Sequence, residues 1–153
     1  MPAPLDLVRE LAAADHGLAV AVVVRADGTP HASVVNAGVL DHPVDGEPVV
    51  GFVARGGAVK LRHLRARPHG TLVFRAGWRW VAVQGEAELA GPDDPLPGLD
   101  GEGVRLLLRD IFRAAGGRHE DFDEYDRVMA AERRTAVLLR PRRITTNPER
   151  LDR

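Results

Sequence analysis

Short apolar runs rich in valine, separated by turn residues, dominate the first half of the chain. Three such runs occupy residues 18–25, 30–40 and 49–54, and residues 26–29 and 42–48 between them carry Gly, Asp and Pro. Apolar runs of this length between turn residues are typical of β-strands, and the short connections are typical of hairpins. The pattern therefore predicts three consecutive antiparallel strands.

Two further runs predict a second antiparallel pair and a closing strand. Residues 70–76 and 78–89 meet at a tight turn around Gly77, and residues 135–144 form the last run. Strands joined mainly by hairpins favour an antiparallel sheet, because parallel neighbours need a long crossover connection. With about six strands and few helices, we expect a mainly β fold, an antiparallel barrel with peripheral helices.

Helical spacing of apolar residues is confined to a few segments. In the first segment the apolar residues are Leu5, Val8, Leu11 and Ala12. This spacing predicts a short helix that packs across one end of the sheet. Further helices are expected at residues 58–67, 103–115 and 120–133. The intervening 91–100 segment is too short to separate two cores, so we read it as an ordered loop.

Composition bounds the class of protein. A chain of 153 residues with 44% hydrophobic content is expected to form one domain, residues 1–153. The 21 basic and 22 acidic side chains nearly balance, which argues against binding to nucleic acid or anionic lipid by bulk charge. The absence of cysteine excludes disulfides and thiolate sites. The longest apolar run, LAVAVVV, is too short to span a bilayer, and the N-terminus lacks a signal peptide's basic region, so a cytoplasmic protein is expected.

The charges are nearly balanced overall but are unevenly distributed along the chain. Between Glu47 and Glu86 the chain has no acidic residue but seven arginines and lysines, and Lys60 is the only lysine in the chain. Lys60 follows Gly56-Gly57 and falls in the first turn of a predicted helix, where a cation opposes the helix dipole. Glycines and free N–H groups at a helix start favour an anion such as phosphate. The alternative is a solvated basic helix face.

Aromatic and polar side chains on two predicted strands could border a flat ligand. Trp78 and Trp80 are the only tryptophans, and on one strand they would share a face with Gln84, the only glutamine. They could stack on an aromatic ring or simply pack in a sheet or dimer core. Ser33 and Asn36 on the second strand could donate or accept hydrogen bonds to a heterocycle, although they could equally face solvent.

Familiar catalytic and metal-binding motifs are missing from the sequence. There is no GxGxxG after a strand, no phosphate loop ending in GK[ST], no HExxH and no nucleophile elbow at Ser33. Residues 119–124, HEDFDE, gather potential metal ligands, but acidic residues at a helix start are explained by the helix dipole. We therefore expect no metal site, and no catalytic acid or base stands out.

Four segments, taken in order, carry a resemblance to a known family. They are VRADGTPHASVV, VARGGAVKLRHLRARPHGTLVF, GWRWVAVQGEAEL and RRTAVLLRPRRITTNP. Together they resemble the split β-barrel flavin and deazaflavin oxidoreductases, a superfamily that includes the pyridoxamine 5'-phosphate oxidase-like proteins, and most of all its small members that bind the 5-deazaflavin F420. The segment RDIFRAAGGRHEDFDEYDRVMAAERR is similar to the tail of one such group.

The resemblance implies a six-stranded antiparallel split β-barrel that forms a homodimer, with the cofactor at the dimer interface. Lys60 falls on the family's phosphate-binding lysine, and Gly57, Ala58 and Val59 supply the backbone that lines the phosphate. The resemblance also puts Trp78 or Trp80 near the cofactor and the strand from Ser33 to Asn36 under its ring. Some members have an arginine where this chain has Ala58, so Arg62, Arg55 or Arg65 would have to complete the phosphate site.

By the same resemblance, reduced F420 would deliver a hydride to a small electron-poor substrate, while the protein supplies binding and orientation. An FMN-binding oxidase or reductase of the same fold is the nearest alternative. A protein that holds a flavin or deazaflavin without turnover is another. The substrate would be selected by pocket shape, built partly by the partner chain and by loops such as residues 41–48 and 91–100.

Overall fold

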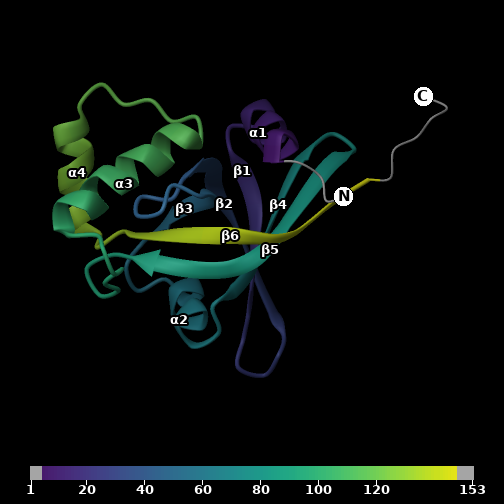
Figure 1. The fold of residues 1–153 in the computed structure, drawn as a ribbon, viewed down its shortest axis with the longest axis horizontal. Helices are drawn as coiled ribbons and strands as arrows, with labels where there is room; N and C mark the ends of the chain where they lie inside the picture. The colour runs from purple at the N-terminus through teal and green to yellow at the C-terminus, as the bar shows by residue number, and fades with distance from the viewer. Residues whose placement is uncertain (1–4, 148–153) are drawn as a thin grey trace.

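Six antiparallel strands close into a barrel in the computed structural model, which describes residues 5–147 (Figure 1). The order around the barrel is β1-β2-β3-β6-β5-β4. The strands are β1 (Leu18–Val24), β2 (Pro30–Asp41), β3 (Pro48–Ala54), β4 (His69–Ala76), β5 (Arg79–Ala90) and β6 (Thr135–Thr146). The predicted barrel and its strand count are confirmed.

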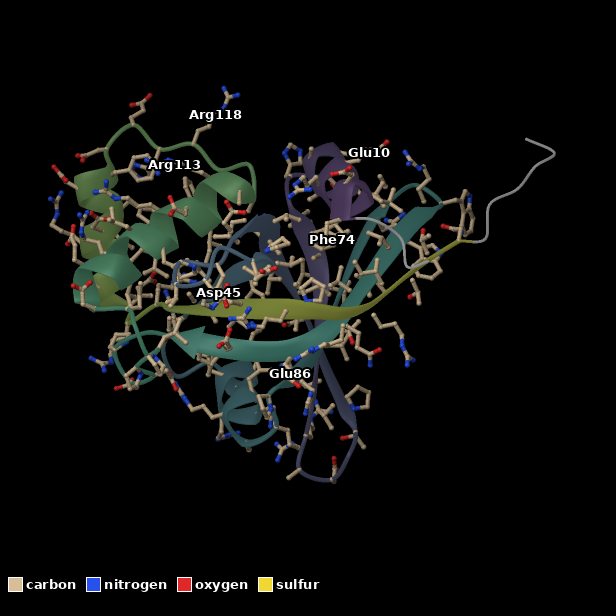
Figure 2. The ribbon with its side chains drawn as sticks, viewed as in Figure 1. Glu10, Asp45, Phe74, Glu86, Arg113 and Arg118 are labelled. Carbon is tan, nitrogen blue, oxygen red and sulfur yellow. The ribbon has the colours of Figure 1, made fainter. Side chains whose placement is uncertain are left out.

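Alternation of side chains along each strand explains why the sheet closes around one core. In β1, Ala19, Ala21 and Val23 are buried and face inward, while the residues between them face outward. Phe74 of β4 is fully buried and lies inside the barrel (Figure 2). Burying one apolar face of every strand provides the main driving force for folding, at about 25 cal/mol per Å² of apolar surface.

Four helices lie around the barrel: α1 (Leu5–Ala14), α2 (Val59–Ala66), α3 (Gly101–Ala114) and α4 (Phe122–Ala131). α1 and α2 lie on different sides of the barrel, and α3 and α4 pack together beyond β2 and β3 (Figure 1). Leu61 and Leu64 of α2 are buried against the barrel core, and this amphipathic face explains why so short a segment is helical.

The C-terminal end of α3 rests directly on β2 because two glycines allow a close approach. A Cβ atom at Gly38 would overlap the carbonyl oxygen of Ala114, and one at Gly17 would overlap that of Ala115. Gly17 also has a φ of 71°, which L side chains rarely adopt. The two glycines therefore fix the position of α3 over the sheet.

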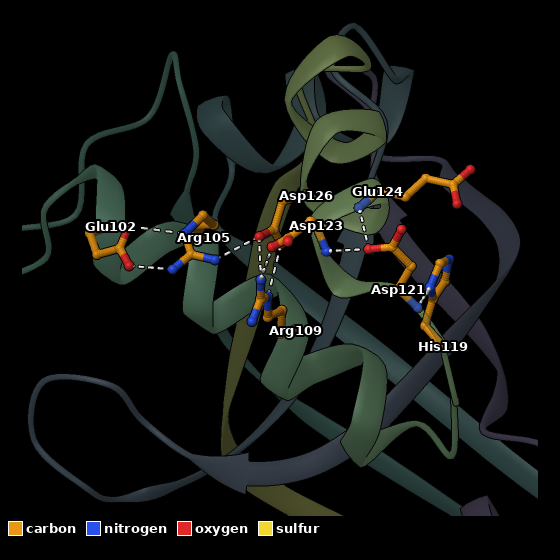
Figure 3. Close-up of polar contacts among 8 residues, drawn as sticks. All are labelled: Glu102, Arg105, Arg109, His119, Asp121, Asp123, Glu124 and Asp126. Carbon is orange, nitrogen blue, oxygen red and sulfur yellow. Dashed lines mark hydrogen bonds and ion pairs between the residues drawn. The ribbon is translucent and has the colours of Figure 1, made fainter.

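The α3–α4 unit, residues 101–131, is held together by an ion network centred on Asp126 of α4 (Figure 3). Arg109 Nε donates to Asp126 Oδ1 at 2.9 Å, and Arg105 donates to Asp126 Oδ2 at 2.6 Å. Glu102 pairs with the other side of Arg105. These arginines hold the pKa of Asp126 below its usual range, through the hydrogen bond from Arg109 first.

Most predicted elements agree with the structure to within two residues at each end, but one inference is wrong. Trp78 and Trp80 do not share a strand face, because Ala76 pairs with Arg79 and β5 begins there. Gly77, with a φ of 62°, and Trp78 form the two-residue turn of this hairpin instead.

Among residues 5–147, no helix is long and apolar enough to cross a membrane.

The HEDFDE segment leads into α4: Asp121 accepts hydrogen bonds from the backbone N–H groups of Asp123 and Glu124 at 3.0 and 3.1 Å. Its carboxylate thus caps the helix.

Candidate functional site

A pocket of about 400 Å³ lies between the outer face of the barrel and the α3–α4 unit. β2 and β3 form its floor through Asn36 and Val53, and the end of α3 with α4 forms its walls. Its lining is His16, Asn36, Val53, Ile111, Phe112, Ala115, Gly116, Gly117, Tyr125, Met129 and Arg134. Apolar and aromatic walls with a few polar groups are typical of a site for a flat organic molecule.

The aromatic wall of the pocket is tightly packed. Phe112 and Tyr125 lie with ring centroids 5.0 Å apart, and Phe122 packs edge-on against Phe112. Tyr125 donates its hydroxyl to the Leu108 carbonyl oxygen at 3.0 Å. Burial raises the pKa of Tyr125, so this hydroxyl stays protonated at neutral pH. The wall is therefore rigid and uncharged.

Arg134 is the cation of the pocket. It precedes β6 and donates from Nε to Glu132 Oε1 at 3.1 Å. Glu132 is shared, because Arg55 also pairs with it. One carboxylate thus faces two guanidinium groups, which leaves a net positive charge beside the pocket.

The charge of Arg134 acts on Lys60. Partial burial lowers the pKa of the Lys60 ammonium below its usual value, and the Coulomb repulsion of Arg134 lowers it further. Across residues 5–147, no carboxylate forms an ion pair with Lys60. A half-buried cation beside a second cation is unfavourable unless an anion binds, and such arrangements are typical of ligand sites.

The segment before Lys60 is shaped by its glycines for two different reasons. Gly56 packs against the turn before β6: its N–H donates to the Glu132 carbonyl at 3.0 Å, and a Cβ there would contact Arg133. Gly57 has a φ of 84° and open space around its Cα. Ala58 is the N-cap of α2 and offers no side-chain hydrogen bond to the helix N-terminus. The N–H groups of Ala58 and Leu61 have backbone acceptors, which leaves those of Val59 and Lys60 for another acceptor.

Of the three arginines expected to complete the phosphate site, two are engaged elsewhere. Arg65 makes two hydrogen bonds to Asp94, both 2.7 Å long, and Arg55 pairs with Glu132. Arg62 is exposed and forms no ion pair within residues 5–147. Arg134, which sequence reasoning missed, also pairs with Glu132 but acts on Lys60 through its charge.

Ser33 and Asn36 lie on opposite faces of β2. Asn36 faces outward, lines the pocket and donates from Nδ2 to the His16 carbonyl at 2.9 Å. Ser33 faces the same side as the buried Val35 and Ala37, and its Oγ is buried with no hydrogen-bond partner within residues 5–147. Only Asn36 is therefore brought to the pocket of its own chain.

The tryptophans lie far from Lys60 within one chain. The chain passes from α2 into the first residue of β4, His69, whereas Trp78 and Trp80 come after the other end of β4 (Figure 1). Trp78 is 91% exposed, and Trp80 is partly buried. Neither lines the pocket described above. A site that used both Lys60 and a tryptophan would have to span two subunits.

The pocket residues from α3 and α4 had no recognisable sequence signal. Phe112, Tyr125 and Met129 fall at apolar helical positions, where packing in a core is the simplest expectation. Arg134 is one of 20 arginines in the sequence. The acid-free stretch that pointed to Lys60 ends before these residues, so only the folded arrangement brings them together.

A comparison with protein families decides the classification. The family model for pyridoxamine 5'-phosphate oxidase matches residues 6–146. The chain belongs to the pyridoxamine 5'-phosphate oxidase family. The predicted superfamily is therefore confirmed, and it includes oxidoreductases.

Solved structures with this fold are described as proteins that use different ligands. A pyridoxamine 5'-phosphate oxidase-related, FMN-binding protein of Nostoc punctiforme matches with a TM-score of 0.65 and 12% identity, over 95% of this chain and 85% of that one. A protein described as an F420 reductase matches with a TM-score of 0.56 and 18% identity, over 84% and 88%. A haem-binding protein of Mycobacterium smegmatis matches with a TM-score of 0.63 and 17% identity, over 96% of this chain and 55% of that one. At these identities the likeness shows the fold alone.

Proposed function

We propose that the protein is an oxidoreductase that binds F420 in the pocket between β2, β3 and the α3–α4 unit, with Lys60 holding the cofactor phosphate. The observation that carries this proposal is the half-buried Lys60, which has no carboxylate partner within residues 5–147 and has Arg134 beside it. When bound, reduced F420 would supply a hydride to a small electron-poor acceptor, which takes its balancing proton from water.

The residues present fit such a cofactor. Lys60 and Arg134 are cations that suit a phosphate, and the α2 N-terminus adds N–H groups without a side-chain cap. The apolar and aromatic pocket walls suit a planar ring system. Arg134 takes the role that the family's arginine fills at the position of Ala58.

Lys60 does not itself line the pocket, and each residue of the proposed site then has its own task. Lys60 and Arg134 neutralise the phosphate, and Asn36 offers a fixed amide beside the ring, because its Nδ2 is anchored on the His16 carbonyl. Phe112 and Tyr125 exclude water from one side of the ring. No side chain of the pocket is required to act as an acid or base.

The same proposal includes a homodimer. Apolar residues of β1 and β2 face outward from the barrel: Val34 is 65% exposed and pairs with Val20, which is also exposed. Trp78 adds a large exposed ring. Burying this face against a second copy would bring residues of one subunit near the site of the other, including Trp78 or Trp80. Light scattering that gave a monomer at micromolar protein would overturn this part.

FMN is the nearest alternative cofactor, and the FMN-binding Nostoc protein of the same fold favours testing it. FMN also has a phosphate and a planar ring, so Lys60 and the pocket would serve it equally well. Tightly bound FMN would copurify and colour the protein yellow. A colourless protein that binds added F420 more tightly than FMN would support the deazaflavin.

Catalysis is tested by mixing the protein with reduced F420 and a panel of electron-poor acceptors, such as quinones and nitroaromatics, without oxygen. The proposal expects reoxidation of F420 that depends on protein and acceptor together, with one reduced acceptor formed per F420 oxidised. Binding without turnover for every acceptor would instead identify a protein that stores or carries the cofactor.

A further inference from the structure

Two arginine–histidine pairs meet where the β1–β2 hairpin lies beside α2. In the first pair, Arg25 contacts His31 Nδ1 at 3.4 Å, and in the second, Arg67 contacts His63 Nδ1 at 3.3 Å. The two imidazole rings lie close together, tilted by 52° with centroids 5.9 Å apart. None of these four residues lines the pocket between β2, β3 and the α3–α4 unit. The hairpin tip and α2 are adjacent in Figure 1.

Both guanidinium groups are held in place by backbone carbonyls of the hairpin. Arg25 donates to the Pro30 carbonyl oxygen at 2.6 Å, and Arg67 Nε donates to the Val24 carbonyl oxygen at 2.9 Å. Their orientation is therefore set before any ligand binds. Fixed donors lose less side-chain entropy on binding, which favours affinity.

The hydrogen bonds also determine which face of each histidine is free. A guanidinium group can only donate, so the Nδ1 atoms of His31 and His63 must accept. In the neutral ring the proton then sits on Nε2, which becomes a donor. Two arginines and two histidines thus present donors and no acceptor.

The charges around His63 are cationic, and the nearby carboxylate of Asp27 interacts with Arg25 but is engaged by Thr29. Burial lowers the pKa of His63, and the charges that lower it further are those of Arg67, Arg62, His31 and Arg25, in that order. Asp27, on the same hairpin, accepts hydrogen bonds from the Thr29 N–H at 3.0 Å and the Thr29 hydroxyl at 2.6 Å.

Within residues 5–147, neither Arg25 nor Arg67 forms an ion pair with a carboxylate. With two guanidinium groups and only the Asp27 carboxylate nearby, which acts on Arg25 without forming an ion pair, the cluster keeps a net positive charge. An anion is the partner that such a cluster lacks.

We propose that Arg25, His31, His63 and Arg67 form a second binding site, for a phosphate group or a similar dianionic oxyanion. Guanidinium forks and imidazole N–H groups match phosphate oxygens in geometry and charge. Within this site His63 lies three residues after Lys60 on α2 and Arg67 caps the C-terminal end of that helix, so the two sites use different residues. It does not depend on the F420 proposal.

The direct test is NMR of the histidine rings during titration with sulfate, which stays a dianion throughout the working pH range. Saturable shifts of His31 and His63 are expected, together with a rise in the pKa of His63, because a bound dianion offsets its cationic neighbours. His119, in the α3–α4 loop, serves as the internal control and should not move. Equal shifts in chloride at the same ionic strength, or no shift of His63, would overturn the proposal.

Two variants separate this site from the cofactor pocket. Arg67→Gln should weaken sulfate binding at least tenfold, while Lys60→Ala should leave it unchanged, with melting temperatures confirming that both proteins fold. If Lys60→Ala abolished the His63 shift, the sulfate would be bound at Lys60 and the second site would be wrong.

The source of the phosphate group is found by competition. Inorganic phosphate and glycerol phosphate are each added to the sulfate complex. Competition by both indicates a site for phosphomonoesters, and competition by inorganic phosphate alone indicates a site for the free ion. Failure of both to displace sulfate would contradict the assignment to phosphate.

Discussion

Two regions of the molecule use cationic side chains in opposite ways. In the α3–α4 unit, Arg105 and Arg109 are matched by Asp126 and Glu102, and their hydrogen bonds join one helix to the other (Figure 3). On the α2 side of the barrel, Lys60 has no carboxylate partner within residues 5–147 and has another cation beside it.

The difference separates structural charges from those that await a ligand. Charges that are paired within the fold contribute modestly to its stability and need no ligand as a counter-ion. Charges left unpaired near a pocket reduce stability slightly and gain their partner only when a ligand arrives. Variants of the two regions should therefore differ in which property they change.

The largest effect on stability is expected where the α3–α4 unit meets the barrel. Gly38→Ala would force a methyl group into the Ala114 carbonyl, so α3 must shift away from β2. We expect a loss of about 1–3 kcal/mol in the free energy of unfolding, together with weaker cofactor binding. Gly101→Ala is the matched control, since a Cβ there meets nothing within 4 Å. Urea denaturation measures both, and equal stability of the two variants would show that the close approach is not limiting.

A smaller loss is expected from Asp126→Asn, and it should depend on pH. Because the folded state lowers the pKa of Asp126, its ionisation stabilises the protein above the usual aspartate range of about 4. That contribution disappears as pH falls through the lowered pKa. The gap in unfolding free energy between wild type and variant should therefore be widest at neutral pH and close at low pH. A gap that is constant with pH would assign Asp126 a packing role instead.

The same contrast shows how much of the fold and of the candidate site could be predicted from the sequence. The barrel followed from valine-rich runs and turn residues, and the position of Lys60 followed from the double glycine and the absence of acidic residues. Trp78 was misplaced because a two-residue turn moves one residue out of a strand and so breaks the alternation. Arg134 could not be found, because its nearness to Lys60 arises from contacts between segments about 70 residues apart in sequence, as chain closure in a barrel requires.

The charge of Lys60 should depend on pH in the opposite sense to the charge of Asp126. Its pKa is lowered, so its charge is lost as pH rises, starting below the usual lysine range of about 10.4. Affinity for an anionic cofactor should therefore decline on the alkaline side in wild type. Lys60→Arg should remove that decline, because arginine stays charged, while restoring only part of the affinity at neutral pH. Parallel pH profiles for the two proteins would exclude Lys60 as the group that titrates.

The smallest effect on stability is expected from Lys60→Ala itself. The ammonium is partly desolvated and repelled by Arg134, so its removal should leave the melting temperature unchanged or slightly higher. Thermal unfolding followed by circular dichroism is sufficient. A clear decrease would place Lys60 among the structural charges, with Arg105 and Arg109.

Cofactor affinity in wild type and Lys60→Ala is the most direct test of the account. Calorimetric titrations with F420, and separately with FMN, include Arg118→Ala as the control, because the exposed Arg118 side chain projects from the α3–α4 loop (Figure 2) and does not line the pocket. We predict that wild type and Arg118→Ala bind alike, with a dissociation constant on the order of tens of micromolar or below. Lys60→Ala should bind at least about tenfold more weakly, since hydrogen bonds to charged groups contribute roughly 1.5–3 kcal/mol. Equal binding by all three proteins, or binding of neither cofactor by wild type, would contradict the account.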